Sequence, residues 1–119
     1  MGFKLCSVDV KIWSYSLIKN IFKSIPKNLP KELIQTLVKN DKVRIEKIVS
    51  RGHSSPKDFW YNQNEWVILL KGSARIIFKE NLEIISLSAG DYFNISKHVL
   101  HRVEWTDPSV ETIWLAVFY

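Results

Sequence analysis

The side chains best suited to chemistry in this 119-residue chain are three histidines and a set of scattered carboxylates. His53 lies near the middle of the chain and His98 and His101 lie near its end, whereas the only cysteine, Cys6, lies near its start. A lone cysteine cannot form a disulfide within the chain and cannot supply a cysteine-rich zinc site. The sequence contains no Gly-x-Ser-x-Gly elbow, no phosphate-binding loop and no dinucleotide fingerprint. Nucleophilic chemistry is therefore not supported, which leaves histidine and carboxylate chemistry.

The elements that must position these side chains begin at Val43. From there the chain consists of short runs rich in Val, Ile and aromatic residues, with turn residues between them. The runs are VRIEKIV, EWVILL, ARIIFK, LEIISL, DYFNI, HRVEW and TIWLAVFY. Runs spaced about ten residues apart are typical of an all-β sandwich or barrel, and the segment to Tyr119 has room for about eight strands. No helices alternate with these runs, so a parallel α/β sheet is excluded.

The first 42 residues are predicted to form an arm and a short amphipathic helix, and residues 43–119 the barrel. Pro30 suits the first turn of a helix over residues 30–40, since its missing N–H is not needed there. Apolar residues spaced four apart give that helix one apolar face: Leu33 with Leu37, and Ile34 with Val38. Residues 1–19 carry weaker signals and are expected to form an extra strand or a loosely attached arm.

The net charge of +5 comes from the leading part of the chain. Residues 1–51 hold eleven Lys and Arg against four Asp and Glu, whereas residues 52–119 hold six against eight. The basic residues of the leading part are spaced singly among apolar ones, which is typical of solvated edges, so we expect no nucleic-acid partner. No apolar run reaches the length of a membrane span, and no signal peptide is visible, so we expect no membrane partner and a cytoplasmic protein.

Three glycines mark the ends of strands, where a positive φ angle is expected, and their spacing frames a first motif. Gly52 is followed after five residues by Asp58, Phe59 and Trp60, then after four more by Glu65 and after six more by Gly72. This frame resembles the first motif of the cupin family, in which Gly, five residues, His-x-His, three or four residues, Glu, six residues and Gly follow one another. Asp58 and Trp60 stand where the family has its two histidines.

The second motif of the same family also has a counterpart, beginning at Gly90. His101 stands where the family has its histidine, whereas Ser96, His98 and Trp105 depart from the pattern of Pro, Gly and Asn. The resemblance covers about residues 44–119, and the chain is most similar to small single-domain cupins without an assigned function. It implies a double-stranded β-helix, that is, a jelly-roll barrel, and commonly a homodimer.

The resemblance also implies a site for one divalent transition metal, Fe, Mn, Ni or Zn, held by three histidines and a glutamate. Here only Glu65 and His101 are kept, and strand alternation allows both to point inward. Completing the site would need Asp58, at the place of the first histidine, or His53, in a loop that overhangs the barrel mouth. The alternative is that Glu65 is a buried acid hydrogen-bonded to a neighbour and that His101 is paired with it. Trp60 argues against a metal, because an indole cannot be a ligand.

Aromatic residues could make the barrel mouth a pocket for a small molecule. Trp60, Tyr61 and Trp105 are the candidates, and the alternative is that these rings are only part of the core. Two classes of function follow from the resemblance. One is a metal-dependent enzyme of the oxygenase or isomerase type acting on a small molecule. The other is a cupin without metal that binds a small ligand or is structural.

Overall fold

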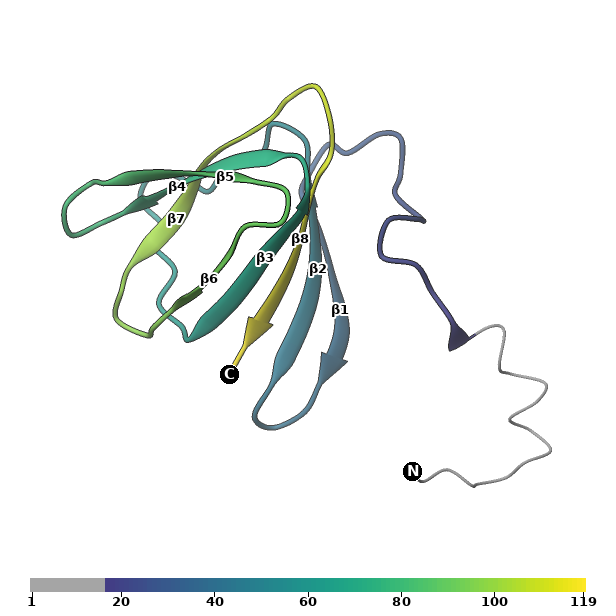
Figure 1. Cartoon of the computed structure of the whole chain (residues 1–119), viewed down its shortest axis with the longest axis horizontal. Coiled ribbons are helices and arrows are strands. Elements are labelled where there is room, and N and C mark those ends of the chain that lie inside the picture. Colours follow the sequence, from purple (N-terminus) through teal and green to yellow (C-terminus); the bar gives the residue numbers. More distant parts are fainter. Residues whose placement is uncertain (1–16) are drawn as a thin grey trace.

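The computed structural model describes residues 17–119, which form eight strands in two antiparallel sheets (Figure 1). The strands are β1 (Leu33–Lys39), β2 (Arg44–Ser50), β3 (Glu65–Lys71), β4 (Ser73–Phe78), β5 (Ile84–Ser88), β6 (Tyr92–Ile95), β7 (His101–Thr106) and β8 (Thr112–Phe118). The larger sheet has the order β1-β2-β8-β3-β6 and the smaller sheet the order β5-β4-β7. The expected all-β jelly-roll fold is confirmed, and each of the seven sequence runs forms one of the strands β2 to β8. No helix among these residues has the length and apolar character that crossing a bilayer requires.

The prediction of a helix over residues 30–40 was wrong, because this segment contains strand β1. Residues four apart share a face in a helix and also in a strand, so the spacing of Ile34 and Val38 fits both. Asn40, expected to end the helix, instead makes the turn to β2, where its Oδ1 accepts the backbone N–H groups of Lys42 and Val43 at 2.9 Å each. Pairing with β2 places β1 in the larger sheet. The division of the chain at residue 42 stays a prediction, although the sheet begins before it.

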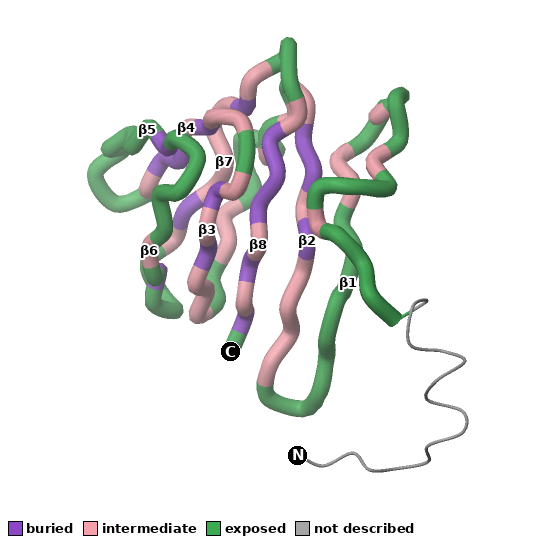
Figure 2. Tube along the Cα trace, turned by 45° about the vertical axis from the view of Figure 1, so that its right-hand side comes forward, coloured by how far each residue is buried: buried purple, intermediate pink, exposed green. Residues whose placement is uncertain are grey.

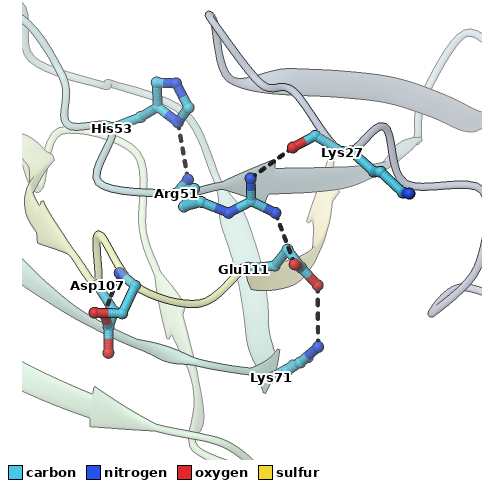
Figure 3. Close-up of polar contacts among 7 residues, drawn as sticks. Lys27, Arg51, His53, Lys71, Asp107 and Glu111 are labelled. Carbon is cyan, nitrogen blue, oxygen red and sulfur yellow. Dashed lines mark hydrogen bonds and ion pairs between the residues drawn. The ribbon is translucent and has the colours of Figure 1, made fainter.

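The segment that precedes β1 crosses the outer face of the larger sheet (Figure 2). Two cations bind its backbone. Lys47 Nζ donates to the carbonyl of Lys23 at 2.9 Å. The Arg51 guanidinium donates to the carbonyl of Lys27 at 2.9 Å (Figure 3). Lys47 is buried there, and the neighbouring Val49 is fully covered. The basic residues of β2 and of the turn after it therefore hold the leading segment on the barrel. Residues 1–16, with Cys6, lie outside the described residues.

The main core lies between the two sheets. Alternate residues of β3, β4 and β8 point into it, together with one residue of β5. Its buried members are Val67, Leu69, Ala74, Ile76, Leu87, Trp114, Ala116 and Phe118. Register pairs such as Val67 with Ala116 bring these side chains to the same face of the sheet. The inward positions of β3 beyond Glu65 are therefore filled by apolar side chains.

The three glycines of the sequence motifs have the positive φ angles expected of them, +78° at Gly52, +89° at Gly72 and +96° at Gly90. Gly72 joins β3 to β4 and also has no room for a side chain. A Cβ atom there would lie 2.7 Å from the carbonyl oxygen of Glu111 and in closer contact with Thr112. The turn after β3 therefore requires glycine both for its backbone conformation and for its close approach to the start of β8.

Candidate functional site

Glu65 and His101 are the first residues of two strands in opposite sheets, and the fold brings their side chains together. Glu65 begins β3 and faces inward with Val67 and Leu69, as strand alternation predicts. His101 begins β7, where Phe78 of β4 is its register partner. The Glu65 Oε1 and His101 Nε2 atoms are 2.9 Å apart, and the two side chains are 13% and 4% exposed. The pair thus joins the two sheets at one end of the barrel.

The second ring nitrogen of His101 fixes how the pair holds its proton. Nδ1 lies 3.0 Å from the carbonyl oxygen of Val99, which can only accept a hydrogen bond, so Nδ1 carries a proton. A contact of 2.9 Å between Nε2 and Glu65 Oε1 needs one further proton between them, since two lone pairs would repel. That proton makes either an imidazolium with a carboxylate or a neutral imidazole with a carboxylic acid. In both forms the second oxygen of Glu65, Oε2, keeps lone pairs that can accept a hydrogen bond.

Tyr61 covers His101 from the loop between β2 and β3. Its backbone forms an isolated bridge with His101, donating to the carbonyl at 2.7 Å, and the two rings stack with centroids 5.8 Å apart. Burial raises the pKa of the Tyr61 hydroxyl, and the carboxylates of Glu32 and Glu65 raise it further. The phenol therefore stays protonated and able to donate a hydrogen bond near neutral pH.

These groups surround a cavity of about 350 Å³, large enough for a small organic molecule. Its wall is formed by the inner faces of both sheets and by the loop before β3. The residues of that wall are Glu32, Ile34, Arg44, Glu46, Ile48, Ser55, Phe59, Trp60, Tyr61, Asn62, Gln63, Glu65, Val67, Ile76, His101, Val103, Trp114 and Phe118. The cavity is therefore mostly apolar and aromatic, with a few convergent polar groups beside the Glu65–His101 pair.

Three charged residues of the wall were missed by the sequence analysis. Arg44 and Glu46 alternate with Ile48 along β2, and their side chains form an ion pair at 2.8 Å. Glu32 precedes β1, and Ser50 Oγ donates to its Oε2 at 2.8 Å. Charged residues at alternate positions of a strand usually mark a solvent face, so the pattern of β2 alone suggests the wrong side. Arg44 and Glu46 are on the inner face because Lys47 and Val49, on the other face, lie under the leading segment.

One donor in the wall lacks a partner. Trp114, on β8, is 4% exposed, and its Nε1–H has no acceptor among residues 17–119. A buried N–H group without a partner is rare in folded proteins. The Nε1 atom itself is covered by protein, so the cavity does not open onto it.

Three predicted site residues lie outside the cavity. Asp58 is exposed in the loop before Trp60. The Nδ1 atom of His53 accepts the backbone N–H of Arg51 at 2.9 Å, so this imidazole caps a turn (Figure 3). Trp105 points to the outer face, where the guanidinium of Arg75 lies 4.4 Å from its ring. The ring changes side because a β-bulge interrupts the register of β4 with β7 before Trp105, which shifts the alternation by one residue.

The other two predicted pocket residues, Trp60 and Tyr61, do line the cavity. The four-ligand metal site implied by the cupin resemblance does not fit the residues present. Of its positions, only Glu65 and His101 face the cavity with ligating atoms, since an indole supplies none. Within the described part of the chain, no three His, Cys, Asp or Glu side chains are grouped closely enough to hold an ion. The geometry fits a hydrogen-bonded pair.

Comparison with known proteins places the fold. No family model and no curated protein matches the chain. A solved protein of Ralstonia eutropha JMP134, provisionally named a mannose-6-phosphate isomerase, is 38% identical over 85% of this chain and 95% of its own, with a TM-score of 0.79. A cupin superfamily protein of Desulfitobacterium hafniense DCB-2 is 21% identical over 79% and 82%, with a TM-score of 0.64. Fe(II)-HppE with an alternative substrate is 19% identical over 82% and 54%, with a TM-score of 0.61. The last two likenesses show the fold alone.

Proposed function

The chain belongs to the cupin superfamily, and on that premise we propose that its barrel binds a small organic molecule in the cavity beside Glu65 and His101. The observation that carries this proposal is the buried pair at the wall of a cavity of about 350 Å³. The apolar and aromatic wall contributes affinity, and the pair with its shared proton orients a polar group of the ligand. No metal ion is needed for this role, because each ring nitrogen of His101 already has a protein partner.

The test is a screen of small cyclic alcohols, acids and amines by thermal shift and by ¹H–¹⁵N NMR. The indole N–H signals of Trp60 and Trp114, which both line the cavity, should move when a compound binds. Ile34→Trp should block binding, because Ile34 lies in the cavity wall. Leu37→Trp is the matched control, since Leu37 is on the same strand but lies beside Lys47 of the outer face. Equal binding by both variants, or no movement of either indole signal, would refute the proposal.

A metal-dependent enzyme of the oxygenase or isomerase type is the second candidate, and one observation favours it. A backbone carbonyl that fixes Nδ1–H, as Val99 does for His101, is the usual support of a histidine whose Nε2 binds a metal. If this candidate holds, protein purified without a metal-affinity tag should contain near-stoichiometric Fe, Mn, Ni or Zn. His101→Ala should then lose the metal, whereas His53→Ala should keep it. Metal-free protein that takes up no ion on titration would remove this candidate and leave the first.

Other expectations from the sequence stay predictions: a homodimer, a cytoplasmic location, and no nucleic-acid or membrane partner. Light scattering of the full chain would decide the first. A mass of twice 14.0 kDa is the expected result.

A further inference from the structure

The charges on the cavity wall form two pairs and leave one carboxylate over. The wall has three carboxylates, those of Glu32, Glu46 and Glu65, but no lysine. Arg44 is the only guanidinium of the wall, and it already makes three contacts. It forms an ion pair with Glu46 at 2.8 Å, donates to the side-chain oxygen of Gln63 at 3.2 Å, and lies 4.3 Å from the ring centroid of Phe118. Arg44 therefore neutralises Glu46 and has little capacity left for an anion in the cavity.

The Glu65–His101 pair adds no net charge. Because one proton lies between Glu65 Oε1 and His101 Nε2, the pair is either a carboxylate with an imidazolium or two neutral groups, and both sum to zero. Glu32 is then the carboxylate without a countercharge. Ser50 donates to one of its oxygens, and no Lys, Arg or His within residues 17–119 forms an ion pair with it. The wall thus carries one net negative charge.

Two further features of the wall favour a positively charged ligand. The pKa of Tyr61 is raised first by burial and next by Glu32, so the field of that carboxylate reaches the phenol on the wall. Phe59 and Tyr61, whose ring centroids are 4.7 Å apart, line the same cavity as Glu32, and the faces of such rings attract cations.

We infer that the cavity selects a small organic cation, an ammonium or guanidinium compound, and disfavours phosphorylated sugars. This inference rests on the proposed function, because it specifies the ligand of that same cavity. An ammonium group would lie near Glu32 and Tyr61, with its organic part against the aromatic wall. A phosphate group would meet the uncompensated carboxylate and would find Arg44 already occupied. The provisional name of the Ralstonia protein, which refers to a sugar phosphate, therefore does not carry over to the ligand of this chain.

The test compares probes of similar shape and different charge by calorimetric titration at neutral pH and low salt. The probes are benzylammonium, benzyl alcohol, benzoate and mannose 6-phosphate. We expect benzylammonium to bind the full chain roughly five- to tenfold more tightly than benzyl alcohol, and both anions to bind more weakly than the alcohol. Glu32→Gln should abolish the preference for the cation, so that benzylammonium and benzyl alcohol bind with similar affinity. Glu80→Gln, at an exposed position outside the cavity, should change neither affinity.

The outcomes separate the two proposals. Benzoate or mannose 6-phosphate binding as tightly as benzylammonium would overturn the charge selectivity and leave the binding function standing. Binding of none of the four probes would overturn both. If Glu32→Gln does not fold, a salt series on the unmodified protein decides. Raising the salt from about 20 to about 300 mM should weaken benzylammonium but not benzyl alcohol, and equal salt dependence would overturn the inference.

Discussion

Replacing Glu65 by alanine should destabilise the barrel by about 2 kcal/mol, because it leaves the Nε2 atom of His101 without its partner. The side chains are 13% and 4% exposed, so their hydrogen bond of 2.9 Å is almost shielded from bulk water. Removing one partner of a fully buried pair costs about 3–5 kcal/mol. The adjoining cavity lowers that figure here, because water can enter and bind the orphaned nitrogen. Urea unfolding at pH 7 measures the difference, with Glu80→Ala, at an exposed turn, as the control within about 0.5 kcal/mol.

Glu65→Gln separates the role of the hydrogen bond from that of the charge. A glutamine amide can donate to Nε2 of a neutral His101 while Nδ1–H still donates to Val99, so the loss should stay below about 1 kcal/mol. Spectra of ¹⁵N-labelled histidine should show Nδ1 protonated in both proteins, and Nε2 unprotonated in the variant. A glutamine variant as unstable as the alanine variant, or one whose Nε2 is protonated, would refute the reasoning.

Three further predictions concern the frame around the site. Gly90→Ala should lower the stability of the fold by about 1–2 kcal/mol, because φ is +96° there although the space around it is open. Gly72→Ala should lower it by at least about 3 kcal/mol, because its Cβ would also overlap Thr112. Equal urea midpoints for the two variants would refute the steric part of this reasoning. His98→Gly should be neutral or stabilise by up to about 1 kcal/mol, because His98 has a φ of +80° where the second motif has glycine; a clear loss in urea unfolding would contradict this. The pKa of Glu111 is lowered by its hydrogen bond from an arginine and next by one from a lysine. A carboxylate whose pKa is lowered by folding stabilises the fold at every pH above its pKa in the unfolded chain. At pH 7 the unmodified protein should therefore be more stable than Glu111→Gln, by less than about 1 kcal/mol because the ion pairs are partly exposed. Unfolding measured at lower pH should show this difference disappear.

Much of the barrel could be predicted because its signals are local. Each strand from β2 to β8 is a run of β-branched and aromatic residues between turns, and each motif glycine has the positive φ angle that its position suggested. Strand β1 could not be identified in this way, because apolar residues four apart fit two periods. The partner that decides between them is β2, which supplies the hydrogen bonds of the hairpin. Secondary structure was thus misassigned where only a neighbouring strand resolves it.

The residues of the site also divide into those that local signals position and those that depend on contacts elsewhere in the chain. Strand alternation placed Glu65 and His101 correctly because each is the first residue of its strand, before any irregularity. Trp105 follows the bulge of β7, where the alternation has shifted by one residue, and it therefore faces outward. Glu32 gave no signal at all, since its place in the cavity depends on how the leading segment approaches β1. The residues that match the family motifs are thus the ones that the sequence positions reliably, whereas the carboxylate that sets the net charge of the cavity comes from outside both motifs. Proteins that share the motifs but differ in the leading segment should therefore differ in the charge of the ligand they accept.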